Sequence, residues 1–186
     1  TVHASGVDID DICSNINGYL CSLATWLEEN QLELSPRKLS ATIFTNSTKE
    51  VSAELSVVIS SMKIPTVKNP TSLGVTFDPL HTFSDHTRNV RKKLQKKNNV
   101  LSALAKSTWG KDKELICTTY KTIGRSVAKY AAPVWTPSVS ETNWSRLQSC
   151  QKAALRTATG KVRMTQQEDL HRETMNIAGK LPEKSP

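Results

Sequence analysis

The apolar residues of this chain change their spacing along the sequence, and that change restricts the fold to a mixture of helices and strands. Between residues 9 and 27 they recur at three- and four-residue steps, which puts them on one face of a helix. Asp8, Asp10 and Asp11 suit the positive end of the helix dipole and can cap its first N–H groups. Asn30 is expected to end the helix.

Beyond this helix the period changes to two. In residues 39–44 the apolar Leu39, Ala41 and Ile43 alternate with Ser40, Thr42 and Phe44, which predicts a strand. AELSVVIS (53–60) and LGVTFD (73–78) are predicted as further strands, and their short connections favour antiparallel hairpins. Pro65 and Pro70 suit turns or edge strands rather than a central strand.

Helical spacing returns at Ser84. Gly110 and Gly160 are expected to interrupt it, and Ser140 is expected to cap the helix that ends at Gly160. The fold class that follows is α+β, with a helix and a small antiparallel sheet before a bundle of helices. The predicted helices of this second half cover residues 84–109, 111–135, 140–160 and 165–179, and a loose tail follows them.

Positive charge is concentrated in one part of the chain. The net charge is +8, yet residues 85–130 alone hold twelve Lys and Arg against three acids. Residues 1–36 hold six acids and no Lys or Arg. This distribution favours a surface that faces a polyanion, although a solvated helix face is the alternative interpretation of any such run.

The cations of the first basic helix are the predicted nucleic-acid contacts. Their positions cover a broad helical face, while Val90, Leu94 and Leu101 are expected to face inward. Each phosphate that they neutralise on a duplex would make the slope of log affinity against log salt concentration steeper by about 0.9. The predicted contacts are Arg88, Arg91, Lys92, Lys93, Lys96, Lys97 and Lys106.

Cysteine, histidine and tryptophan give weaker signals. The four cysteines show no Cys-x-x-Cys pair and no nearby His, so they are expected to be buried or half-buried thiols rather than zinc ligands. Trp26 and Trp135 adjoin apolar positions and are expected to pack rather than to stack on bases. No apolar run approaches the roughly 18 residues of a membrane span, and the acidic N-terminus is unlike a secretory signal. The expectation is therefore an intracellular protein, cytoplasmic or nuclear, without a membrane partner.

Several motifs stand in an order that resembles a known family. They are LELSPRK (32–38), LGVTFD (73–78), STWG (107–110), YAAPVW (130–135) and LRTATG (155–160). In this order they resemble the C-terminal portion of the reverse transcriptase of non-LTR retrotransposons, in particular the jockey-like group. The resemblance extends from about Thr1 to Gly160.

This resemblance implies RNA-directed DNA synthesis with Mg²⁺, and a template–primer duplex, RNA–DNA or DNA, as the partner. It implies that residues 1–79 are the end of a polymerase palm with a primer-grip-like hairpin, and that residues 80–160 are a basic helical thumb. Residues 161–186 would be a short helix and a flexible tail. The missing fingers and palm portion would be a further partner in the intact polyprotein.

The catalytic carboxylates of that family have no counterpart here. The chain opens on Thr1-Val2-His3-Ala4-Ser5, which is similar to the stretch that follows the family's Y-x-D-D box. Two-metal phosphoryl transfer needs carboxylates that hold two ions about 3.5–4 Å apart. Asp10 and Asp11 point about 100° apart on a helix and are explained by its dipole. We therefore expect no metal site in this chain, and no polymerisation by this chain alone.

Two further positions acquire roles from the resemblance. Lys38 aligns with a lysine proposed to protonate the departing pyrophosphate, so it is a vestigial general-acid position; the alternative is a solvated lysine after a proline turn. Leu73, Gly74 and Val75 resemble the primer-grip turn, where a glycine permits close approach to the primer. The alternative there is an ordinary strand or bulge glycine.

Two rival hypotheses for the whole chain remain open. One is a stand-alone nucleic-acid-binding or domesticated interaction protein. The other is a non-functional remnant of a decayed element, or an incomplete gene model.

Overall fold

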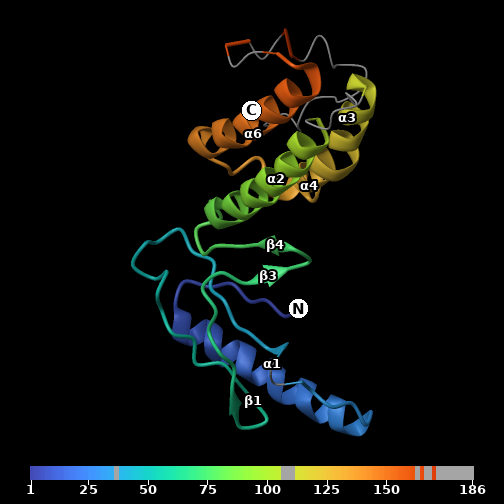
Figure 1. Cartoon of the computed structure of the whole chain (residues 1–186). Coiled ribbons are helices and arrows are strands. Elements are labelled where there is room, and N and C mark those ends of the chain that lie inside the picture. Colours follow the sequence, from blue (N-terminus) through green and yellow to red (C-terminus); the bar gives the residue numbers. More distant parts are fainter. Residues whose placement is uncertain (36–37, 106–111, 162–163, 166–168, 171–186) are drawn as a thin grey trace. The chain divides into compact units, whose positions relative to one another are not determined.

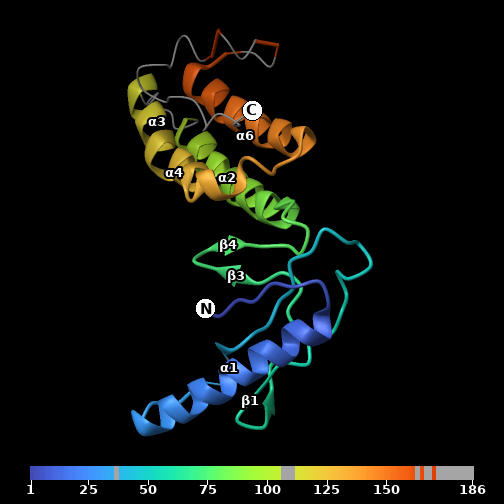
Figure 2. The same ribbon diagram turned by 180° about the vertical axis from the view of Figure 1, so that it is seen from behind.

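The computed structural model describes residues 1–35, 38–105, 112–161, 164–165 and 169–170. The chain divides into two compact units, Thr1–His81 and Thr82–Pro186 (Figure 1). The first unit contains a long helix and two short antiparallel hairpins, and the second is helical in its described part, as Figure 2 also shows from behind. The α+β class expected from the sequence is confirmed at this level.

Helix α1 (Ile9–Glu29) begins and ends where the sequence predicts. The Asp8 side chain accepts a 3.4 Å hydrogen bond from the backbone N–H of Asp10, and Asn30 is the C-terminal cap. Cys13 and Leu20 are buried on the inner face, together with residues of the following loops and hairpin. The core of the first unit contains Cys13, Leu20, Leu55, Val57, Ile59 and Ile64.

Asn17 holds the first hairpin against α1. Its Nδ2 donates a 2.9 Å hydrogen bond to the carbonyl oxygen of Ser56, and its Oδ1 accepts one of 2.9 Å from the N–H of Val58. Strand β1 (Val58–Ile59) pairs antiparallel with β2 (Met62–Lys63). One amide side chain therefore satisfies backbone groups on the outer edge of a sheet that has only two strands.

The second hairpin consists of β3 (Thr71–Ser72) and β4 (Val75–Thr76), again antiparallel. Leu73 and Gly74 form its two-residue turn, with φ angles of 47° and 78°. The predicted antiparallel hairpins are thus confirmed, but the strands are much shorter than 53–60 and 73–78. They form two separate sheets instead of one.

The predicted strand over residues 39–44 is wrong. Only Ala41 makes a β-bridge, parallel to Thr66, with its N–H donating to Pro65 and its carbonyl accepting from Val67. The next rung toward Leu39 would require a backbone N–H on residue 65, and proline has none. The alternating side chains still serve packing, since Leu39, Ala41 and Ile43 lie against the core.

In the second unit, α2 (Ser84–Ala105) packs along α6 (Glu141–Thr159). The Ser140 hydroxyl caps α6 by accepting a 3.4 Å hydrogen bond from the N–H of Asn143. Gly160 ends it with a φ of 66°, as the sequence predicts. The core beneath these helices contains Leu101, Ile116, Cys117, Tyr120, Ala154, Leu155, Ala158 and Leu170.

Between α2 and α6 the chain is helical but interrupted. It runs through α3 (Lys113–Tyr120), a π-helical turn η2 (Lys121–Arg125) and α4 (Ser126–Lys129). The predicted single helix over 111–135 then breaks, because Ala131 adopts a left-handed φ of 48° before the short α5 (Ala132–Trp135). Gly110 and most of the predicted helix 165–179 lie outside the described residues.

Two expectations about individual side chains need correction. Trp135 is 1% exposed, which confirms its packing role, whereas Trp26 is 52% exposed on α1. All four cysteines are free thiols, and three are buried, but Cys21 is exposed. In both wrong cases the residue lies on the outer face of α1, because only a narrow stripe of that helix is covered. None of the helices in the described part of the chain is both long and apolar enough to cross a membrane.

Candidate nucleic-acid interface

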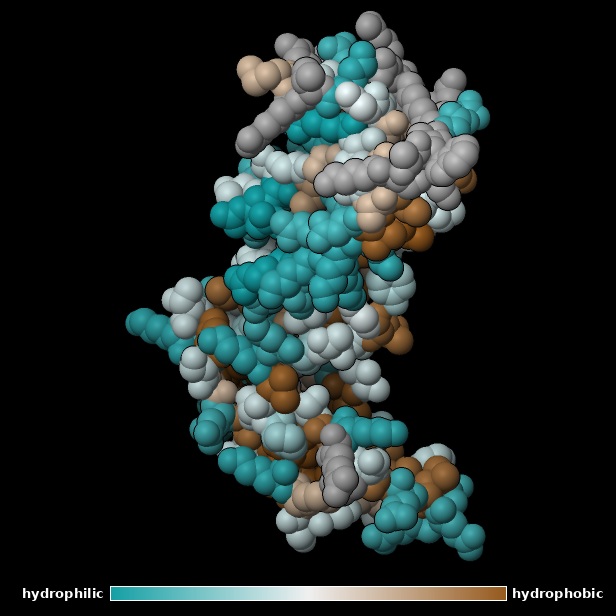
Figure 3. Space-filling view, viewed as in Figure 1, coloured by the Kyte–Doolittle hydropathy of each residue, from teal (hydrophilic) through white to brown (hydrophobic). Residues whose placement is uncertain are grey.

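Helix α2 carries six of the seven predicted basic contacts. Val90, Leu94 and Leu101 are 5%, 2% and 0% exposed, which confirms that this stripe faces inward. A helix turns by about 100° per residue, so the cations are left to occupy the remaining arc. Figure 3 shows hydrophilic side chains gathered over this part of the second unit. The seventh predicted contact, Lys106, lies outside the described residues.

The exposed cations form two rows along α2. Arg88, Lys92 and Lys96 follow one another at four-residue steps, about 6 Å apart along the axis. Lys93 and Lys97 form a second row beside the first. All five side chains are exposed, and we call them the cationic face of α2.

Within the described part of the chain, few acidic groups neutralise this face. Arg88 makes a 2.6 Å ion pair with Asp85. Lys92, Lys93, Lys96 and Lys97 form no ion pair with any described residue. Like charges four residues apart destabilise a helix by about 0.2–0.5 kcal/mol per pair. The cationic face therefore opposes the stability of its own helix, which is the electrostatic state that an external polyanion would relieve.

Arg91 differs from its neighbours because it is only half-exposed and turns toward α6. Burial raises the pKa of the Cys150 thiol, and a hydrogen bond and positive charge from Arg91 act in the opposite direction. Arg91 is thus held against the neighbouring helix instead of extending into solvent with the cationic face.

The β3–β4 turn presents an apolar tip. Leu73 is 87% exposed, and both it and Gly74 have positive φ. Two positive φ values match the tight turn that a right-twisted two-residue hairpin requires. Val75 is 5% exposed, so its side chain belongs to the interior and only Leu73 and Gly74 offer surface to a ligand.

Lys38 follows the end of α1, in a segment whose described residues form no regular strand. Its side chain is exposed, and its backbone N–H donates a 3.1 Å hydrogen bond to the carbonyl of Ser35. Asp10 and Asp11 are exposed in the first turn of α1. Among the described residues, no three His, Cys, Asp or Glu side chains gather where they could hold a metal ion.

Sequence reasoning missed the groove between α2 and α6. Arg91 and Asn98 lie on its α2 wall, and Arg146 lies on its α6 wall. A signal was available, because the segment 141–159 contains three basic residues and only one acid. The sequence could not tell which of those cations would face α2.

No protein-family model, no curated protein and no solved structure matches this chain. The resemblance to reverse transcriptases thus rests on its motifs and their order.

Proposed function

We propose that this chain is the palm–thumb part of a non-LTR retrotransposon reverse transcriptase, and that it binds a template–primer duplex through the phosphate backbone. The observation that carries the proposal is the cationic face of α2, whose lysines are exposed and unpaired within the described residues. The order of the motifs supports the proposed family, and the positive charge of α2 supports binding to phosphate groups.

Binding of this kind is driven by the release of counterions from the duplex. Contacts to phosphate fix the position of the protein without reading base sequence, which suits a polymerase that must accept every sequence. Four lysine–phosphate contacts give a slope of about −3.6 in log affinity against log salt, or roughly a 100-fold loss between 50 and 200 mM salt.

The β3–β4 turn is the proposed primer-grip element. Its exposed tip offers the Leu73 side chain and the close backbone approach that Gly74 permits. Lys38 keeps its assignment by resemblance, as the position that would donate a proton to pyrophosphate in an intact enzyme. For this chain the proposal concerns duplex binding.

Fluorescence anisotropy with a labelled RNA–DNA hybrid tests this function. We expect micromolar affinity at low salt, the steep salt slope given above, and at least a tenfold weaker complex for Lys92→Glu/Lys96→Glu. The matched control is Lys49→Glu/Lys68→Glu, which makes the same charge change at two exposed lysines of the first unit. Equal losses in both variants, or an affinity independent of salt, would contradict the proposal.

A further inference from the structure

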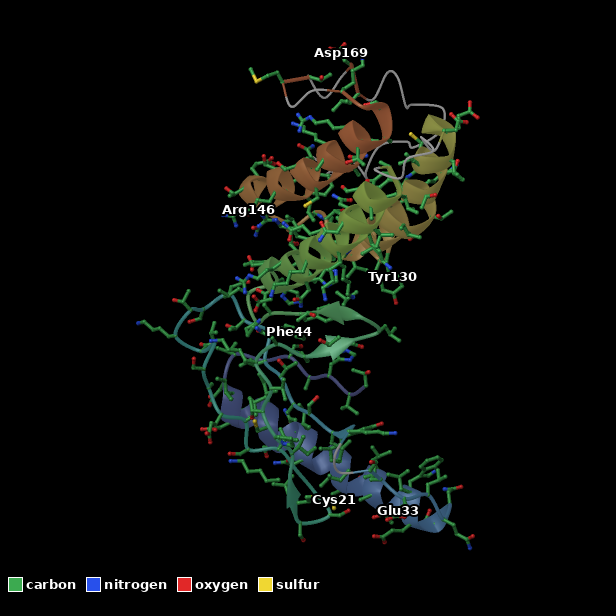
Figure 4. The ribbon with its side chains drawn as sticks, viewed as in Figure 1. Cys21, Glu33, Phe44, Tyr130, Arg146 and Asp169 are labelled. Atoms are coloured by element: carbon green, nitrogen blue, oxygen red, sulfur yellow. The ribbon has the colours of Figure 1, made fainter. Side chains whose placement is uncertain are left out.

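A groove with a volume of about 380 Å³, lined mainly by residues with polar side chains, runs between α2 and α6 within the second unit. Its walls contain two arginines and no carboxylate, with Arg91 on α2 and Arg146 on α6. Figure 4 labels Arg146 on its helix. A groove of this composition attracts anions, because nothing in its lining offsets the two guanidinium charges. Its other polar lining includes Gln95, Asn98, Asn99, Ser102, Ser149 and Thr157.

Arg91, which lines this groove, has a buried donor without a partner. Its Nε is buried and has no hydrogen-bond partner among the described residues. A buried donor without a partner is unfavourable, and because this Nε has almost no accessible surface, an acceptor in the groove reaches it only after a small shift of the Arg91 side chain. A guanidinium group presents its N–H donors in a planar fork that matches two oxygens of a phosphate.

Asn98 has an unused acceptor in the same groove. Its Nδ2 donates a 2.8 Å hydrogen bond to the backbone carbonyl of Cys150, and a carbonyl can only accept, so this bond fixes the orientation of the amide. The Oδ1 atom is consequently directed elsewhere, and it too is buried without a partner among the described residues. The residues that line the groove thus include an acceptor without a partner as well as a donor without one.

Arg146 completes the arrangement from the opposite wall. It is exposed, and its Nη1 donates a weak 3.3 Å hydrogen bond to Oδ1 of Asn143, one turn earlier on α6. No described carboxylate pairs with it. Its remaining N–H groups can therefore turn to an anion in the groove without breaking an ion pair.

We propose that the α2–α6 groove is a phosphate-binding site that holds the backbone of a nucleic-acid strand between Arg91 and Arg146. In this arrangement Asn98 accepts a hydrogen bond from a sugar hydroxyl or a base amino group of the same strand. The groove is distinct from the exposed cationic face of α2. Phosphate binding in the groove does not depend on the proposed function, whereas the assignment of that phosphate to a nucleic-acid strand rests on it.

Inorganic phosphate is the first probe. In ¹⁵N-labelled full-length chain, the Arg Nε–H signals of the two residues are assigned by their loss in Arg91→Lys and Arg146→Lys. Titration with phosphate at constant ionic strength should shift both signals along one saturation curve, whereas chloride should not. Two signals that stay in place, or that shift equally with chloride, would overturn the site.

Single-stranded RNA and DNA oligonucleotides are the second probe, and they separate a nucleic-acid strand from free phosphate as the source. We expect both Nε–H signals to shift, and the affinity of Arg91→Gln/Arg146→Gln to fall at least tenfold further than that of Lys49→Gln/Lys68→Gln. Arg91→Lys should fail to restore binding although it keeps the charge, because lysine lacks the planar fork. Shifts with phosphate but not with oligonucleotides would refute the binding of a nucleic-acid strand in the groove.

The folding of Arg146 variants is not at risk, since this side chain is exposed, so Arg146→Gln alone keeps the test valid if Arg91→Gln unfolds. The two proposals also fail separately. If charge reversal at Lys92 and Lys96 weakens duplex binding while the arginine variants behave as the control does, the groove is refuted and the proposed function stands.

Discussion

Gly124 lies directly against the aromatic ring of Tyr120, where a Cβ atom on the glycine would be 2.7 Å from two ring carbons. The contact occurs in the π-helical turn η2, immediately after α3. Tyr120 is 1% exposed and belongs to the core shared by α2, α3 and α6, so its ring has no room to move aside. The absent side chain at residue 124 is what lets this helix carry a large aromatic residue inward at this position.

The change Gly124→Ala should therefore destabilise the second unit by about 1–3 kcal/mol through overpacking. Chemical unfolding followed by the fluorescence of the buried Trp135 and Trp144 measures this. Gly18→Ala is the matched control, because nothing lies within 4 Å of the added atom on α1. In that helix the change should stabilise by up to about 1 kcal/mol. A Gly124→Ala protein as stable as the parent would show that the ring is not fixed.

The change Lys92→Glu should raise stability while it lowers nucleic-acid affinity. It converts the like-charge pairs with Arg88 and Lys96 into opposite pairs, a gain of about 1 kcal/mol for α2. Thermal melting and hybrid binding, measured on the same sample, test both directions. Lys49→Glu should leave the second unit's melting temperature unchanged. If Lys92→Glu destabilises the unit, repulsion between the like charges of the cationic face does not destabilise α2.

The change Leu73→Asn should stabilise the β3–β4 hairpin by up to about 1 kcal/mol. Leucine is disfavoured at a φ of 47°, whereas Asn-Gly is the preferred pair for such a turn. The readout is slower hydrogen exchange at the amide of Phe77, which donates to the carbonyl of Pro70 at 2.9 Å. Gly74→Ala, at a φ of 78°, should have the opposite effect. Faster exchange in Leu73→Asn would mean that the leucine side chain holds the turn.

His86 should make the second unit less stable in mild acid. Burial lowers its pKa below the ordinary value of 6.5, and the charge of Lys93 lowers it further. As the pH falls below about 6.5, the unfolded chain binds a proton before the folded one does, so the free energy of unfolding decreases. This contribution is fully present above pH 6.5 and is lost toward the lowered pKa of the folded state.

Denaturant unfolding between pH 5 and pH 8 measures the effect, with His86→Gln as the comparison. The variant removes the titrating group, so its stability should change less over this interval than that of the parent. His86 packs edge-on to Trp135 with ring centroids 5.4 Å apart, so a constant offset in stability is expected as well. Parallel pH curves for the two proteins would assign the acid sensitivity to other groups.

The sequence determined the elements whose causes are local. Helix α1 begins after Asp8 and ends at Asn30, and α6 begins after Ser140 and ends at Gly160. These limits could be predicted because caps act on backbone groups within one turn. The buried face of α2 could also be predicted from the sequence, since helical spacing alone separates that face from the cations of the helix.

Tertiary structure decided what depends on distant partners. Alternation over residues 39–44 shows which side chains can be buried, but a strand also needs a partner with free N–H groups, and the partner segment contains Pro65. The groove is a stronger case, because Asn98 and Cys150 are 52 residues apart in sequence. Their hydrogen bond, and the approach of Arg91 to Arg146, exist only once α2 and α6 pack together, and no local pattern encodes that pairing of faces.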